Sequence, residues 1–139
     1  MTVPYFLDSN VLLYAALGRL DAPRKWAKAV ELIAGAEFGT STQVMQEFYR
    51  NAIRKTAVPL TPAEAMKWIE SLERLPLVIV DVPLIKAAAL VCERYKITYW
   101  DSAILAAAER LEAPLVYSEG LNHTQNYGSV RVENPFRGL

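Results

Sequence analysis

The alternation of short apolar segments with longer stretches of helical periodicity is the feature that most constrains how this chain can fold. Most of these segments are rich in Val, Leu, Tyr or Phe, as buried strands are. Strands that alternate with helices form a mostly parallel sheet with helices on both faces. We therefore predict an α/β fold whose strands are residues 3–7, 37–41, 77–80, 114–118 and 129–133.

Helix boundaries follow from capping residues and from the apolar periodicity. Thr61, Pro62 and Glu64 have the types and spacing of a capping box with proline at the first helical position. Gly18 ends one helical pattern, and Asp21 precedes the next. The predicted helices are residues 10–17, 21–34, 43–55, 60–75, 83–95 and 99–112.

The composition excludes several classes of protein. The chain has 139 residues, 53% of them hydrophobic, which suits a single globular domain over residues 1–139. Its formal net charge is zero, so a polyanion would have to meet a local patch or a groove between two subunits. The one cysteine, Cys92, suits a reducing compartment, and no apolar run reaches the roughly 18 residues of a membrane helix. We therefore expect a cytoplasmic protein.

Polar side chains follow two of the predicted strands, at the point where each strand ends. Asp8 comes directly after the first apolar segment, and Ser118 and Glu119 directly follow the apolar residues "PLVY" at 114–117. In open sheets of parallel strands, ligands bind beyond the carboxyl ends of the strands. We therefore expect these side chains to lie at one edge of the sheet.

Two further carboxylates lie beside apolar helix faces. Asp101 falls in the first turn of its helix, three and four residues before Ile104 and Leu105, and Glu47 directly precedes Phe48. Each acid also has a purely structural reading. Asp8 and Asp101 have the positions of helix-capping acids, and Glu47 can pair with a neighbour one turn away.

Taken together, Asp8, Glu47 and Asp101 predict a cation site. Two carboxylates about 4 Å apart repel by about 4 kcal/mol at an effective dielectric near 20, so a cluster of three needs protons or a cation. Mg²⁺ prefers such oxygen ligands and keeps several waters. A zinc site is excluded because the chain has one cysteine and one histidine, His123, which we expect to form hydrogen bonds in a polar loop.

A hard divalent cation at such a cluster activates water for in-line displacement at phosphorus. The sequence contains no phosphate-binding glycine loop and no serine nucleophile motif, which leaves metal-dependent phosphodiester hydrolysis as the favoured chemistry. A phosphatase or phospho-receiver, which also places an aspartate after the first strand, is disfavoured because "DSN" lacks a second nearby aspartate.

Four segments of the chain resemble, in order, those of PIN-domain proteins, specifically the toxins of VapBC-type toxin–antitoxin pairs. They read "FLDSNVLLYAA", "STQVMQEFYRNAIRK", "ITYWDSAILAAAERL" and "LVYSEGLNHTQNYGSVRVENPF". The resemblance implies a three-layer α/β/α sandwich on a mostly parallel four- to five-stranded sheet, and a homodimer. It implies Mg²⁺- or Mn²⁺-dependent cleavage of single-stranded RNA, with tRNA or rRNA as substrate, and inhibition by a VapB-type antitoxin. Asp8, Glu47 and Asp101 match the metal-holding acids of that family.

The fourth segment departs from the family pattern at Gly120. Similar proteins read Ser-Glu-Asp-Leu where this chain reads "SEGL", so glycine stands in the place of an acid. Glu119 or Asn122 is then the alternative source of an oxygen ligand. The departure also leaves open a second hypothesis, a PIN-like module of weakened or absent activity that binds an antitoxin or RNA.

Residues for substrate binding are predicted around these acids. Ser9 and Ser118 adjoin the carboxylates, and Arg50 and Arg54 follow Glu47, where they either contact phosphates or form a solvated helix face. Tyr99 and Trp100 precede Asp101. They either stack on an unpaired base or, as we expect for a tryptophan entering an apolar helix, pack into the core.

Overall fold

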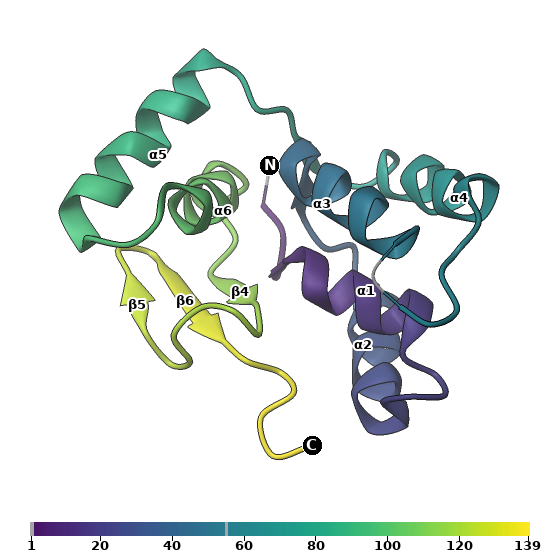
Figure 1. Cartoon of the computed structure of the whole chain (residues 1–139). Helices are drawn as coiled ribbons and strands as arrows, with labels where there is room; N and C mark the ends of the chain where they lie inside the picture. The colour runs from purple at the N-terminus through teal and green to yellow at the C-terminus, as the bar shows by residue number, and fades with distance from the viewer. Residues whose placement is uncertain (1, 55) are drawn as a thin grey trace.

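The computed structural model describes residues 2–54 and 56–139, and its strands and helices alternate as predicted (Figure 1). The predicted strands are present but shorter. The strands are β1 (Phe6–Leu7), β2 (Thr40–Ser41), β3 (Leu77–Val78), β4 (Leu115–Tyr117), β5 (Asn126–Tyr127) and β6 (Val130–Glu133). The helices are α1 (Ser9–Leu17), α2 (Pro23–Gly35), α3 (Thr42–Ala52), α4 (Pro62–Leu72), α5 (Val82–Tyr95) and α6 (Tyr99–Arg110).

The strands form a sheet that is parallel except at one edge. A four-stranded sheet has the order β1-β4-β6-β5, and β2 pairs with β3 in a second, two-stranded ladder. The backbone joins the two ladders, because the Leu7 N–H donates to the Gly39 carbonyl and the Gly39 N–H donates to Tyr5. Glycine at residue 39 also leaves room for the core, since a Cβ there would lie 2.7 Å from Leu111 Cδ1 and 3.1 Å from Val3 Cγ2. β1 therefore runs between β2 and β4.

One strand was not predicted. Residues 126 and 127 form β5, which pairs antiparallel with β6 across a turn at Gly128. The φ of Gly128 is +63°, a left-handed conformation that glycine adopts without strain. The prediction of a polar loop between the last two strands was therefore wrong at Asn126 and Tyr127.

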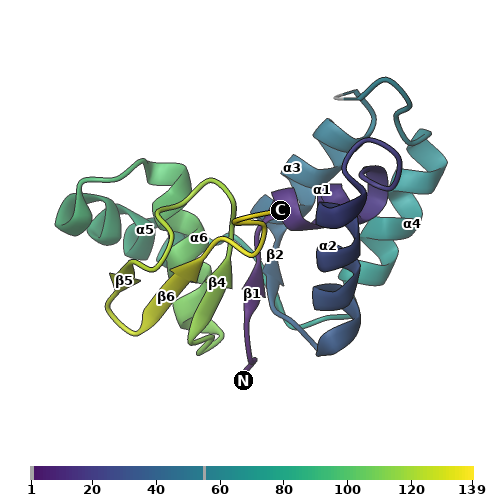
Figure 2. The ribbon, with the colours of Figure 1, turned by 90° about the horizontal axis from the view of Figure 1, so that it is seen from below.

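Helices cover both faces of the sheet, which confirms the predicted α/β sandwich. Figure 2 shows α5 and α6 together on one side and α1 to α4 on the other. The sheet strands and the inner faces of the helices share one apolar core, in which Phe6, Phe48 and Val116 are fully buried. Within the described residues, no helix has the length and apolar character needed to cross a membrane.

Most helix ends fall within a few residues of their predicted positions. α3 ends at Ala52, whereas the predicted end, Lys55, lies outside the described residues. α6 ends at Arg110, because the backbone enters the left-handed region at Glu112, with a φ of 52°. The early end of α6 turns the chain into β4.

The predicted capping box of α4 is present and gives a stability prediction. The Thr61 hydroxyl accepts from the Glu64 N–H at 3.1 Å, and the Glu64 carboxylate accepts from the Thr61 N–H at 2.9 Å. Replacing Thr61 by alanine should lower the free energy of unfolding by about 1 kcal/mol, because one N-terminal N–H loses its partner. Urea denaturation measures this change. Ser71→Ala in the same helix is the control, and an equal loss in both variants would contradict the assignment.

Candidate active site

Asp8 occupies the carboxyl end of β1 and is the most constrained acid of the candidate site. Its side chain is 9% exposed and caps α1, with Oδ1 accepting from the Ser9 N–H at 2.7 Å. The other oxygen, Oδ2, accepts from the Ser118 hydroxyl at 2.8 Å. Asp8 therefore has its predicted capping role, and it lies where parallel strands present their carboxyl ends.

The pKa of Asp8 shows that negative charges gather here. The pKa of Asp8 is raised from 3.8 to about 6, chiefly because the carboxyl group is buried. The hydrogen bonds from Ser118 and Ser9 oppose the rise, and the negative charges of Glu47 and Asp101 contribute to it. The carboxylate that follows β1 thus interacts electrostatically with one carboxylate on α3 and one on α6.

Glu47 is fixed by neighbours on two elements. Its carboxylate accepts from the Ser9 hydroxyl at 3.0 Å and from the Gln43 amide at 3.2 Å. The same Gln43 nitrogen donates to the Trp100 carbonyl at 3.1 Å. Gln43 therefore ties α3 to the first turn of α6, a role that the sequence analysis missed, although its spacing of four residues from Glu47 was a usable signal.

Asp101 lies in the first turn of α6, where the Thr98 hydroxyl caps the helix. The Asp101 N–H donates to that hydroxyl at 3.1 Å, and the Asp101 side chain is half-buried. Its charge acts on Asp8 and also on the buried Tyr127, whose pKa is raised chiefly by burial. The hydrogen bond from the Asn122 side chain to Tyr127 opposes that rise in pKa.

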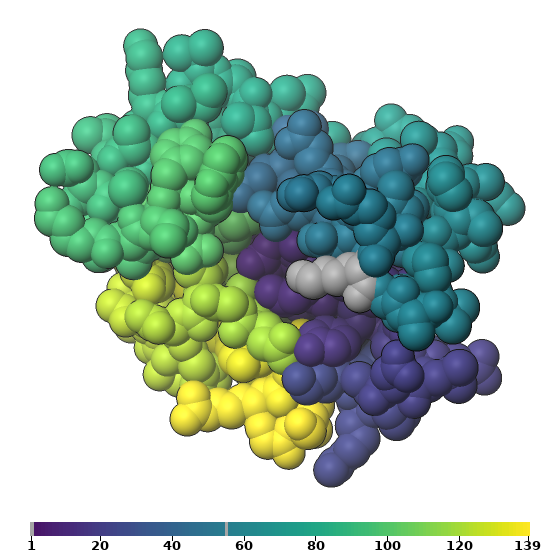
Figure 3. Space-filling view, viewed as in Figure 1, coloured from purple at the N-terminus to yellow at the C-terminus, as the bar shows by residue number. Residues whose placement is uncertain are grey.

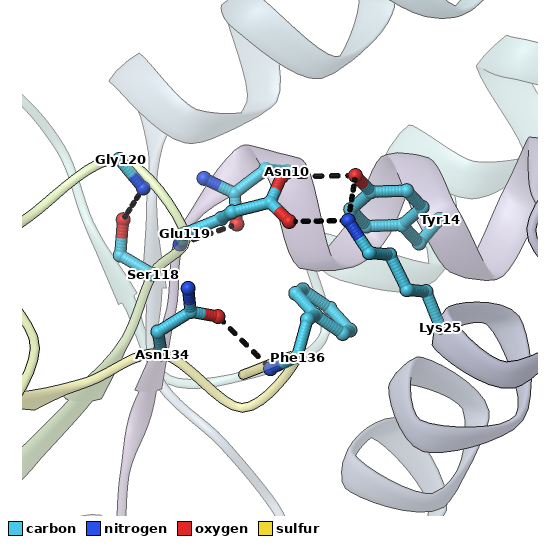
Figure 4. Close-up of polar contacts among 8 residues, drawn as sticks. All are labelled: Asn10, Tyr14, Lys25, Ser118, Glu119, Gly120, Asn134 and Phe136. Atoms are coloured by element: carbon cyan, nitrogen blue, oxygen red, sulfur yellow. Dashed lines mark hydrogen bonds and ion pairs between the residues drawn. The ribbon is translucent and has the colours of Figure 1, made fainter. Parts of the chain in front are cut away.

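Glu119 is directed away from the other acids. Figure 4 shows its carboxylate meeting Lys25 and Tyr14, with the Lys25 ammonium at 2.8 Å and the Tyr14 hydroxyl at 2.9 Å. Its N–H donates to the Asn10 side chain at 3.2 Å. Glu119 therefore joins the loop after β4 to α1 and α2, and its carboxylate is already neutralised. No local sequence pattern points to Lys25 as the partner of Glu119, because the two residues lie 94 positions apart.

Gly120 leaves space beside Ser118. Its N–H donates to the Ser118 hydroxyl at 3.2 Å, and among the described residues beyond its chain neighbours a Cβ at residue 120 would meet only that hydroxyl oxygen, at 4.0 Å. The backbone of Gly120 is not in the left-handed region. A side chain at this position is therefore sterically acceptable and would begin next to the hydroxyl that holds Asp8.

The remaining predicted residues separate into buried and exposed groups. Ser9 and Ser118 are buried, and their hydroxyls are bound to Glu47 and Asp8. Ser118 is 0% exposed, so it positions Asp8 and cannot reach a substrate without leaving that partner. Arg50 and Arg54 are exposed, as both of their predicted roles require. His123 Nδ1 accepts from the Asn134 N–H at 3.0 Å, which confirms its expected role in the loop.

The chemistry of the donor set suits a hard cation. Among residues 2–54 and 56–139, no three His, Cys, Asp or Glu side chains converge closely enough to hold a metal ion together. Mg²⁺ typically takes one or two carboxylates and completes its shell with water. Asp8 and a neighbouring acid are oxygen donors whose mutual repulsion such a cation would relieve.

The surface around this site is hollowed. In Figure 3 the purple N-terminal segment lies in a depression between green atoms of the C-terminal half and blue to teal atoms of the middle of the chain. A cleft of about 360 Å³ is lined by Asn10, Tyr14 and Glu119, among others. A larger cleft of about 570 Å³ lies between α5, α6 and the β5–β6 turn, away from Asp8.

Solved structures share this fold. VapC20 of Mycobacterium tuberculosis, a toxin that cleaves the sarcin-ricin loop, is 19% identical, with a TM-score of 0.70 over 91% of this chain and 98% of that chain. A DNA-bound VapBC from Salmonella typhimurium is 16% identical, with a TM-score of 0.62 over 97% and 99%. VapBC2 from Rickettsia felis, bound to a promoter fragment, is 18% identical, with a TM-score of 0.62 over 94% and 97%.

A search of curated proteins finds no match to this chain. The family model for the PIN domain matches residues 5–126, which is most of the chain. This protein therefore belongs to the PIN domain family.

Proposed function

We propose that this protein is a metal-dependent endoribonuclease and the toxin of a VapBC-type pair. The observation that carries the proposal is the buried Asp8 carboxylate, fixed by two hydrogen bonds and facing the charges of Glu47 and Asp101. A carboxylate is held in this way at a cost in stability, which indicates a functional site. The fold shared with VapC20 and two VapBC proteins supports the choice of substrate and partner.

In this proposal, neighbouring groups orient the three acids, and no protein side chain acts as the nucleophile. Mg²⁺ or Mn²⁺ held by Asp8 with Glu47 or Asp101 would lower the pKa of a bound water and offset charge on a phosphodiester. Ser118 and the Ser9 N–H fix the two oxygens of Asp8, and Gln43 fixes Glu47. Arg50 and Arg54 are exposed and available to hold the RNA backbone.

The proposed partners extend the resemblance to the toxins of VapBC-type pairs. We infer that a VapB-type antitoxin binds this chain, that the active form is a homodimer, and that both act in a prokaryotic cytoplasm. The substrate is a single-stranded region of tRNA or rRNA. Structural relatives captured as VapBC complexes on DNA support the antitoxin assignment.

A second candidate function is a catalytically weakened or silent module that acts by binding the antitoxin or RNA. Gly120 favours it, because an acid is missing beside Ser118 and Glu119 is engaged by Lys25 and Tyr14. The two functions differ in their response to metal. Thermal stabilisation by Mn²⁺ that is lost in Asp8→Ala supports the nuclease, whereas an unchanged melting temperature supports the binding module.

The direct test of the nuclease is cleavage of a mixed tRNA and rRNA pool in Mn²⁺, with the new 5′ ends mapped by sequencing. We expect discrete ends within unpaired regions, and we expect them to disappear with EDTA or with Asp8→Ala. Ends that persist in the Asp8→Ala protein would identify a contaminating nuclease and overturn the assignment.

Restoring an acid at Gly120 should strengthen metal binding. Gly120→Asp adds a carboxylate in open space beside Ser118, and we expect the Mn²⁺ concentration for half-maximal cleavage to fall about 10-fold. Gly120→Asn is the matched control, since it adds nearly the same volume without charge. Equal Mn²⁺ dependence of the Asp and Asn variants would show that charge at this position is not used.

A further inference from the structure

Trp100 is exposed, contrary to the expectation that it packs into the core. Its side chain is 66% exposed at the start of α6, whereas neighbouring Tyr99 is half-buried and packs against the core. The two rings meet edge to face, with centroids 5.2 Å apart and planes at 80°. Tyr99 therefore supports the Trp100 ring from the protein side and leaves it in contact with solvent.

The exposed ring is tied to the candidate active site through the backbone. Trp100 directly precedes Asp101, and its carbonyl accepts from the Gln43 amide at 3.1 Å. That amide also donates to Glu47. The backbone of Trp100 thus shares Gln43 with Glu47, and Trp100 lies with Asp101 in the first turn of α6 rather than in a loose loop.

The net charge of the chain does not attract a nucleic acid, so binding of RNA at this place requires a contact that does not depend on charge. The formal net charge is zero, and the three acids repel the phosphates of a nucleic acid. Base stacking on an aromatic ring binds a strand without opposing charge and without regard to sequence. An exposed indole beside clustered carboxylates fits that requirement.

We propose that Trp100 is a stacking platform that holds an unpaired RNA base beside Asp101. The inference takes its substrate class, RNA, from the proposed function. It adds a residue that selects single strands, because a base within a duplex has both faces covered. A second copy of the chain is the competing occupant. It is disfavoured because Asp101 directly follows Trp100 in the first turn of α6 and Glu47 shares Gln43 with the Trp100 carbonyl, and charged residues are depleted from the centres of protein interfaces.

The test measures binding without cleavage. A fluorescent, single-stranded 2′-O-methyl RNA of mixed sequence is titrated with the full chain in EDTA and followed by anisotropy and by quenching of tryptophan fluorescence. An otherwise identical abasic strand serves as the second probe. The variants are Trp100→Ala, Trp100→Tyr, which keeps a ring, and Leu90→Ala, which removes another large exposed apolar side chain, 72% exposed, on α5.

We expect Trp100→Ala to weaken binding of the base-bearing strand by about 5- to 150-fold, with Trp100→Tyr retaining most of the affinity and Leu90→Ala unchanged. The abasic strand should bind the wild type and Trp100→Ala equally. Unchanged affinity in Trp100→Ala would overturn the inference. So would an equal loss on the abasic strand, or a dimer in light scattering that dissociates only in Trp100→Ala.

The inference and the proposed function fail separately in this design. If binding in EDTA depends on Trp100 but no RNA is cleaved in Mn²⁺, the stacking role stands and the nuclease proposal is rejected. If cleavage depends on Asp8 but is unchanged in Trp100→Ala, the nuclease proposal stands and the stacking role is rejected.

Discussion

Replacing Asp101 by asparagine should reduce Mn²⁺-dependent RNA cleavage by about 100-fold, the largest loss of activity we expect from a change of one atom. Asparagine keeps the shape of the side chain and removes its charge. The hydrogen bond to the Thr98 hydroxyl is donated by the backbone N–H of residue 101, so it is kept in the variant. The fold should therefore be unaffected, and the loss should report on the cation and the substrate alone.

The matched control for Asp101→Asn is Glu109→Gln, which makes the same change of charge at an exposed position near the far end of α6. Initial rates of cleavage at saturating and limiting Mn²⁺ give the comparison. We expect Glu109→Gln to behave as the wild type. Equal rates for both variants and the wild type would show that Asp101 has no part in the reaction.

The acids of the site were predictable because two local rules point to the same edge of the sheet. A parallel strand delivers whatever follows it to the carboxyl edge, which places Asp8 and residue 118 together. A charge beside an apolar helix face must meet something polar in the interior, which identifies Glu47 and Asp101. Both rules can be applied without the distances between helices and strands.

Partners set by tertiary distance were not predictable in the same way. Lys25 reaches Glu119 across 94 residues, and no local pattern distinguishes it from any other helical lysine. The Gly-Ser pair at residues 128 and 129 did carry a hairpin signal, but the polar residues before it suggested a loop. Trp100 was assigned to the core because it enters an apolar helix, and only packing shows which face of α6 it takes.

Asp8→Asn should make the metal-free protein more stable at pH 8, by up to about 3 kcal/mol. The pKa of Asp8 is about 6 in the folded chain against 3.8 for a free side chain, chiefly because the carboxylate is buried. The folded state therefore binds the proton more tightly than the unfolded state. The contribution of Asp8 to the free energy of unfolding falls as pH rises from about 4 to about 6. Above that range the whole cost of burying the charged carboxylate applies.

Asparagine carries no charge at any pH, so its advantage should be present at pH 8 and absent at pH 4. Chemical denaturation of the wild type, Asp8→Asn and Glu109→Gln in EDTA at both pH values isolates the effect, because the other acids cancel in the difference. Saturating Mn²⁺ should stabilise the wild type but not Asp8→Asn. It should therefore reduce the difference in free energy of unfolding between the two proteins at pH 8. An Asp8→Asn protein less stable than the wild type at pH 8 would mean that the bonds from Ser9 and Ser118 outweigh the cost of the buried charge, and that the site needs no cation for its stability.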